Sequence, residues 1–175
     1  VDRIGVKQVL AGQGYSENSC WTRGLAWAIY GSVISYIHTN KKEYLEGAKK
    51  TGECFIENCR KYKYLTPVDF YAPKEPCYCD STAGVCAACG LIELAKHVPG
   101  EEGKKYLEEA LCILTETDKV FCDYTENEDA IVLMGTERYP KDECQLKGVH
   151  IPLIYGDFFF VEAILKLKKR TFMIW

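Results

Sequence analysis

Two tryptophans and an arginine near the start of the chain have the chemistry to bind a sugar acid. Trp21, Arg23 and Trp27 follow a stretch that contains Gly12 and Gly14. On a helix, Arg23 would lie about 40° around the axis from Trp27. Helix N-termini attract anions and arginine holds carboxylates through paired hydrogen bonds, while tryptophan faces stack on sugar rings. The same spacing also fits two core tryptophans and a surface ion pair made by Arg23.

Ten cysteines are the second group of reactive side chains. Cys77 and Cys79 precede Cys86 and Cys89, and four thiolates are able to hold a tetrahedral zinc ion. The first pair lies in a proline-rich stretch, whereas the second lies among alanines and glycines of a predicted helix, where cysteine serves as a small apolar residue. We therefore expect no metal and no other cofactor. Without a secretion signal, free thiols in a reducing compartment are the default, which predicts a cytoplasmic protein.

Other common functional patterns are missing from the sequence. No serine lies in a Gly-x-Ser-x-Gly elbow, and there is neither a Gly-x-Gly-x-x-Gly fingerprint nor a phosphate-binding loop. The net charge of −3 argues against a nucleic-acid partner. No apolar run reaches the roughly 18 residues that a membrane span needs. With 47% hydrophobic and 27% charged residues, the chain has an ordinary globular composition.

Apolar residues recur at helical spacing in five segments. The predicted helices cover residues 20–39, 42–58, 81–98, 103–122 and 157–169. Ser19 and Asp157 are suitable N-caps, and Asn40 is a suitable stop for the first helix. Residues 60–80 contain three prolines and form a long predicted loop. The last helix is apolar nearly all round, which predicts that it is buried.

The helices pair along the sequence as two helix–turn–helix units, at residues 20–58 and 81–122. This pairing suggests a helical toroid or array. Five helices are an odd number for a closed ring of hairpins, and the chain has no initiator methionine. We therefore expect an N-terminal part to be missing. Residues 1–175 alone should then expose apolar flanks, be marginally stable, and dimerise, aggregate or bind the missing part.

The segment around the two tryptophans resembles the unsaturated glucuronyl hydrolases of glycoside hydrolase family 88. The most specific match is Gln-Gly-Tyr-Ser-Glu-Asn-Ser-Cys-Trp-Thr-Arg-Gly at residues 13–24, followed by Ala-Trp-Ala-Ile-Tyr-Gly at 26–31. Supporting matches are Asp-Ser-Thr-Ala at 80–83, Ala-Ala-Cys-Gly-Leu at 87–91 and Leu-Ile-Tyr-Gly-Asp-Phe-Phe-Phe-Val-Glu-Ala at 153–163. Together they extend over nearly the whole chain.

The resemblance implies an all-α fold in which residues 1–175 are the C-terminal half of a single (α/α)6 toroid, built from helical hairpins with long loops. It implies release of 4,5-unsaturated glucuronic acid from the non-reducing end of lyase-generated oligosaccharides, by hydration of the vinyl ether. Gln13 and Arg23 would contact the uronate, and Trp21 and Trp27 would form apolar walls. The acid/base aspartate would belong to the missing N-terminal half, so no catalytic residue is expected here and this part alone would be inactive.

Two other readings of the sequence remain open. The unsaturated rhamnogalacturonyl hydrolases share the toroid and the Trp-x-Arg-Gly core, although residues 21–31 fit the glucuronyl family better. A non-catalytic helical module that binds carbohydrate or another protein is the alternative from a different functional class. An assay of a full-length protein on unsaturated disaccharides separates these readings.

Overall fold

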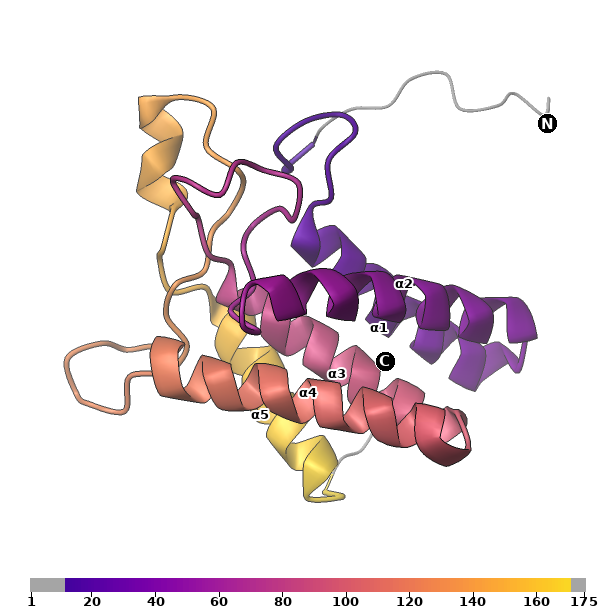
Figure 1. Cartoon of the computed structure of the whole chain (residues 1–175). Helices are drawn as coiled ribbons and strands as arrows, with labels where there is room; N and C mark the ends of the chain where they lie inside the picture. The colour runs from indigo at the N-terminus through magenta and orange to yellow at the C-terminus, as the bar shows by residue number, and fades with distance from the viewer. Residues whose placement is uncertain (1–11, 171–175) are drawn as a thin grey trace.

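Five α-helices and one short 3-10 helix carry the fold in a computed structural model that describes residues 12–170 (Figure 1). Residues 12–170 contain isolated β-bridges but no named strand. The expectation of an all-α chain with long loops is confirmed. The elements in chain order are α1 (Thr22–Thr39), α2 (Lys42–Lys61), α3 (Ser81–His97), α4 (Gly100–Phe121), the 3-10 helix η1 (Glu143–Gly148) and α5 (Ile154–Leu167).

The helices form two layers, and in Figure 1 α2 and α4 lie in front of α1 and α3. α3 packs against both α1 and α5, which lie on different sides of it in Figure 1. α2 lies over α1, and α4 lies over α3. The two antiparallel hairpins α1–α2 and α3–α4 are therefore neighbours, as the pairing along the sequence predicts.

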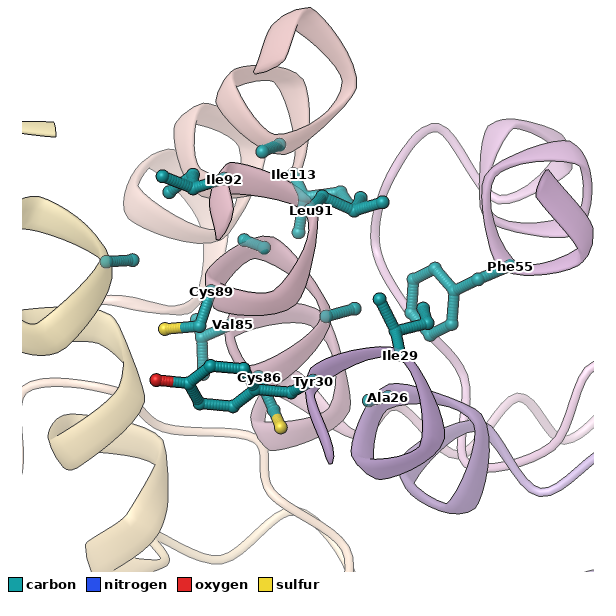
Figure 2. Packing of buried hydrophobic residues seen from close by; sticks show 14 of the residues in the cluster. Ala26, Ile29, Tyr30, Phe55, Val85, Cys86, Cys89, Leu91, Ile92 and Ile113 are labelled. Atoms are coloured by element: carbon teal, nitrogen blue, oxygen red, sulfur yellow. The ribbon is translucent and has the colours of Figure 1, made fainter. Parts of the chain in front are cut away.

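Small side chains allow α3 to sit at this centre. All residues from Ser81 to Leu94 are buried. A Cβ atom added at Gly90 would lie 2.8 Å from Cγ2 of Ile29 and 3.0 Å from the backbone nitrogen of Tyr30. α1 and α3 therefore approach closely, and larger residues pack around the contact (Figure 2).

Gly90→Ala tests this close approach. We expect the free energy of unfolding to fall by about 1–3 kcal/mol, because the added methyl group has to push α1 and α3 apart. Gly31→Ala is the matched control: Gly31 is exposed within α1 and its added Cβ would meet nothing within 4 Å. Alanine should stabilise that position by about 0.5–1 kcal/mol. Urea denaturation measures both, and equal effects would contradict the packing.

Helix boundaries differ from the predicted ones where long-range contacts decide them. α1 begins at Thr22, and Ser19 is not its N-cap, because its hydroxyl donates to Asp69 at 2.6 Å instead. Asp157 lies inside the first turn of α5, where it accepts a hydrogen bond of 2.7 Å from the backbone N–H of Val132. Asn40 does end α1, in the left-handed conformation with φ of 53°. α2 and α4 are each longer than predicted, and α4 begins at Gly100.

The prediction that α5 is buried on nearly all sides is wrong for one face. Among the described helices α5 packs chiefly against α3, so its opposite face has no helical cover. Ile154 is 83% exposed. The exposed apolar residues share one face at spacings of four, three and four: Ile154, Phe158, Val161 and Leu165. We call this set the α5 stripe.

The buried side of α5 carries an unexpected charge cluster. Lys166 is 3% exposed, and its Nζ lies 2.7 Å from Oε1 of Glu93 on α3. It also lies 3.4 Å from Oε1 of Glu162, which accepts a 2.6 Å hydrogen bond from the Tyr30 hydroxyl on α1. This cluster joins the three central helices by polar contacts.

Candidate functional site

The start of α1 is held by the long loop between α2 and α3. The backbone N–H of Thr22 donates to the carbonyl of Val68 at 3.1 Å, and the N–H of Phe70 donates to the carbonyl of Cys20 at 3.0 Å. The Thr22 hydroxyl also donates to the carbonyl of Pro67 at 2.7 Å. The residues at the start of α1 are thereby fixed before any ligand arrives.

Trp21, Arg23 and Trp27 come together at this helix end. The two indole rings meet edge to face, with centroids 5.4 Å apart, and the Arg23 guanidinium carbon lies 5.7 Å from the centre of the Trp21 ring. Trp21 lies over Gly24, where a Cβ would come within 2.8 Å of the ring. Trp27 is 47% exposed, so it is a surface residue of the described chain rather than a core residue.

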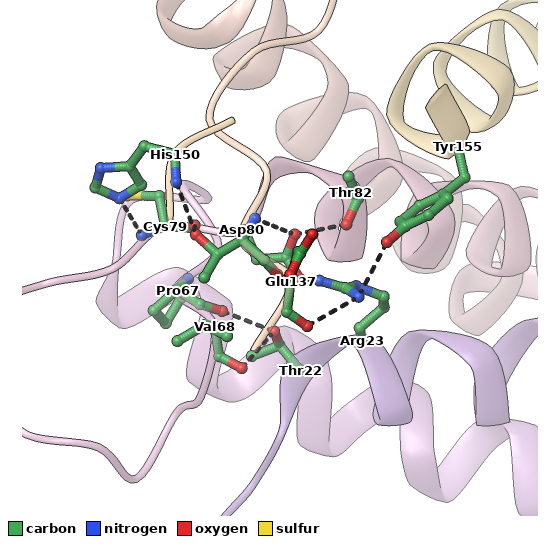
Figure 3. A network of polar contacts seen from close by, with 11 residues as sticks. Thr22, Arg23, Pro67, Val68, Cys79, Asp80, Thr82, Glu137, His150 and Tyr155 are labelled. Carbon is green, nitrogen blue, oxygen red and sulfur yellow. Dashed lines mark hydrogen bonds and ion pairs between the residues drawn. The ribbon is translucent and has the colours of Figure 1, made fainter. Parts of the chain in front are cut away.

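Arg23 is buried, with only 2% of its surface exposed, and all three nitrogens of its guanidinium group contact oxygen atoms of the protein (Figure 3). Nε and Nη2 lie 3.0 and 2.9 Å from Oδ2 of Asp80. Nη2 also donates to the carbonyl of Thr136. Nη1 makes the two longest bonds, 3.3 Å to the Tyr155 hydroxyl and 3.4 Å to the Glu137 carbonyl. The ion pair of Arg23 is thus an interior one, not a surface one.

Asp80 is the counter-charge, and the sequence alone did not identify it as a site residue. It is fully buried, and its Oδ1 accepts a 2.5 Å hydrogen bond from the Thr82 hydroxyl and a 3.4 Å bond from the backbone N–H of Thr136. Burial raises the pKa of Asp80 above its ordinary value, against the opposing effects of Arg23 and these donors. Asp80 therefore serves to hold Arg23.

Gln13 lies at the same end of the molecule but is joined to Arg23 indirectly. Its backbone carbonyl accepts a 2.9 Å hydrogen bond from the N–H of Tyr139. Tyr139 follows Thr136 and Glu137, whose carbonyls bind Arg23. The rings of Tyr15 and Tyr139 pack at 4.8 Å, which strengthens this contact. The structure thus brings three of the four expected residues into contact, with Gln13 tied to them through residues 136–139.

An apolar groove of about 330 Å³ opens beside Trp27, between α1 and α5. The hydroxyl of Tyr30, one of the lining residues, is already bonded to Glu162. The groove suits a flat apolar face rather than a charged group. It is lined by Trp27, Tyr30, Gly31, Ile34 and Phe159.

The cysteines do not form a metal centre in the part of the chain that the structure describes. Among residues 12–170, no three His, Cys, Asp or Glu side chains form a group able to hold a metal ion. Cys86 and Cys89 are buried in α3, whereas Cys77 is exposed. Burial raises the pKa of Cys79 to about 12, so this thiol is protonated and poorly nucleophilic at neutral pH. No described helix is long and apolar enough to cross a membrane.

Comparisons with known proteins agree with the resemblance seen in the sequence. The chain is 32% identical over 165 residues to the unsaturated glucuronyl hydrolase of Formosa agariphila, which covers 92% of the chain and 39% of that protein. It is 26% identical over 166 residues to the unsaturated chondroitin disaccharide hydrolase of Streptococcus pneumoniae, covering 93% of the chain and 41% of that protein. No family model matches.

Solved structures of unsaturated glucuronyl hydrolases resemble this chain in fold as well. The crystal structure of the unsaturated glucuronyl hydrolase from Bacillus sp. GL1, responsible for the degradation of glycosaminoglycan, matches with a TM-score of 0.79 at 28% identity. The match covers 90% of this chain and 41% of that one. The chain therefore spans about two-fifths of the length of the relatives it matches. By sequence and by fold, it is a relative of the unsaturated glucuronyl hydrolases and corresponds to part of their (α/α)6 toroid.

Proposed function

We propose that the protein containing this chain removes 4,5-unsaturated glucuronic acid from the non-reducing end of lyase-generated oligosaccharides, with glycosaminoglycan fragments as the substrate class. The observation that carries the proposal is the Trp21–Arg23–Trp27 cluster, in a chain related to unsaturated glucuronyl hydrolases over 92% of its length. The chondroitin disaccharide hydrolase among the relatives supports the substrate class. The ten free cysteines support a reducing compartment, and we propose the cytoplasm.

Gln13, Trp21, Arg23 and Trp27 are the proposed substrate-binding residues. The exposed Trp27 ring and the groove beside it offer an apolar wall for a sugar. Arg23 reaches the carboxylate through Nη1, which makes the longest of its bonds and so exchanges acceptors at the lowest cost. Asp80 keeps the other side of the guanidinium in place during this exchange.

The reaction needs a proton donor. A proton is added at C4 of the vinyl ether, water adds at C5, and the hemiketal opens to release the neighbouring sugar. The two buried aspartates at the site, Asp69 and Asp80, are both occupied by hydrogen bonds to protein donors. We propose that the acid/base aspartate comes from the remaining part of the toroid.

We propose that the remaining helices of the toroid cover the faces that α1 and α5 leave open. The α5 stripe is the main support, because four exposed apolar residues on one helix face are the pattern expected of a helix that packs against another. The chain matches 41% of the toroid structure, so more than half of that fold lies outside it.

Turnover of an unsaturated chondroitin disaccharide by the full-length protein tests the proposed function. We expect the ultraviolet absorbance of the conjugated double bond to disappear, because hydration at C5 destroys the conjugation. Residues 1–175 alone should leave the absorbance unchanged. A full-length protein that leaves every unsaturated disaccharide intact would contradict the proposal, and binding without turnover would favour a non-catalytic carbohydrate-binding module.

A further inference from the structure

We infer that Asp69 is a positioning residue, which fixes the loop that carries Gln13 over the start of α1. This inference rests on the proposed function for its kinetic consequences, but not for its geometry. We call residues 12–20 the glycine loop. Asp69 lies in the long loop between α2 and α3, and no sequence motif marks it.

The carboxylate of Asp69 gathers four donors, three of them from the glycine loop. Oδ2 accepts from the backbone N–H of Tyr15 at 3.0 Å and from the Ser19 hydroxyl at 2.6 Å. Oδ1 accepts from the N–H of Cys20 at 3.0 Å and from the N–H of Tyr71 at 2.9 Å. Asp69 is 1% exposed, so the glycine loop wraps around a buried charge.

The glycine loop closes tightly on this carboxylate. A Cβ added at Gly14 would lie 2.9 Å from Oδ2 of Asp69 and 3.1 Å from Cβ of Trp21. Gln13 directly precedes Gly14, and its carbonyl is held by the N–H of Tyr139 at 2.9 Å. Gln13 is therefore fixed from both sides, by Tyr139 through its own carbonyl and by Asp69 through the residues that follow it.

The negative charge of Asp69 suits this task better than a neutral amide would. Hydrogen bonds to a carboxylate are stronger than those to a neutral acceptor. None of the ion pairs found among residues 12–170 involves Asp69, so its hydrogen-bond donors stabilise the charge. In Asp69→Asn one carboxylate oxygen becomes an NH2 group. Both oxygens of Asp69 accept from backbone N–H groups, so the NH2 group faces an N–H donor whichever way the amide is turned. The substitution keeps the side chain volume but removes the charge and one of the two acceptor oxygens that hold the loop.

Amide hydrogen exchange tests the anchor without any substrate. In the full-length protein we expect Asp69→Asn to speed exchange at the N–H group of Tyr15 or of Cys20, because these two bond different oxygens of Asp69 and the amide keeps only one oxygen. Asp123→Asn is the matched control, because Asp123 also accepts from a backbone N–H, that of Thr125 at 2.8 Å, but lies at the far end of α4. Unchanged exchange at Tyr15 and Cys20 in Asp69→Asn overturns the inference.

Kinetics on the unsaturated disaccharide test the link to Gln13. We expect Asp69→Asn to raise KM about tenfold or more, with a smaller change in kcat, because binding geometry is lost rather than a reacting group. Gln13→Ala should raise KM similarly, and the double variant should be little worse than either single one, since coupled residues are not additive. If the KM increase of the double variant equals the product of the two single increases, the link between Asp69 and Gln13 is overturned.

A milder variant covers the case in which Asp69→Asn does not fold. Ser19→Ala removes one of the four hydrogen bonds, and we expect faster exchange at Tyr15 and a smaller rise in KM in a folded protein. Wild-type exchange and KM in that variant overturn the inference. If the wild-type protein is inactive but Asp69→Asn still speeds amide exchange in the glycine loop, the proposed function is overturned and the anchoring role of Asp69 stands.

Discussion

Replacing Asp80 by alanine is expected to lower the free energy of unfolding by about 3–5 kcal/mol, because it leaves the buried charge of Arg23 without its partner. Arg23 and Asp80 are 2% and 0% exposed and 2.9 Å apart, so water does not compensate the guanidinium when its partner is gone. The remaining acceptors of Arg23 are neutral carbonyl and hydroxyl oxygens. Urea denaturation monitored by circular dichroism measures the loss.

The double variant Arg23→Met, Asp80→Ala is the control for this interpretation. Removing both charges should cost less than removing Asp80 alone, because no unpaired charge is left inside. A loss below about 1 kcal/mol in Asp80→Ala would instead be the size expected of an exposed ion pair. That outcome would contradict the burial of the Arg23–Asp80 ion pair.

The second large effect is expected at Lys166 on α5. Lys166→Met leaves Glu93 and Glu162 inside without this cation, and we expect stability at neutral pH to fall by about 3–5 kcal/mol. Lys96 also contacts Glu93 at 2.9 Å, but its side chain is 46% exposed, so its compensation is weak. Lys168→Met is the matched control, since Lys168 is exposed at the end of the same helix and should change stability by less than about 0.5 kcal/mol.

The difference in stability between the wild type and Lys166→Met should depend on pH with a definite sign. Burial acts to raise the pKa of Glu93, but Lys166 and Lys96 together hold that pKa below its ordinary value. In the wild type Glu93 therefore contributes stability above about pH 4.3, and this contribution is lost as the pH falls through the folded pKa. In Lys166→Met burial prevails and the pKa rises, so acidification stabilises the variant. The difference in free energy of unfolding between the two proteins should therefore decrease at acidic pH. A difference that does not change with pH would contradict the buried ion pairs of Lys166.

Helices were the most predictable part of the fold, because their signal is local. The 3.6-residue periodicity located all five α-helices of the described chain, and Asn40 marked the end of α1 correctly. The start of α1 was misplaced because Ser19, a good N-cap by type, is taken by Asp69, which lies 50 residues away. Similarly, Asp157 serves the backbone of residues 131 and 132 rather than the end of its own helix.

The site was predictable only in part, for the same reason. Trp21, Arg23 and Trp27 are close in sequence and carry a recognisable motif, so their association followed from the sequence. Asp80 is 57 residues from Arg23, and the acceptors from Thr136 and Glu137 are more than 110 residues away. No spacing rule connects such distant segments, and the fold alone shows that they meet.

The close packing of α3 explains why two of the ten cysteines of the chain lie in this helix. A helix enclosed by four others accepts only side chains of nearly fixed volume, and Cys86 and Cys89 fill such positions at 0% exposure. Cys89 also donates a 3.1 Å hydrogen bond to the carbonyl of Phe159, which alanine cannot do. Positions 86 and 89 should therefore accept only side chains of similar volume, whereas the exposed positions of α2 and α4 should accept most polar residues.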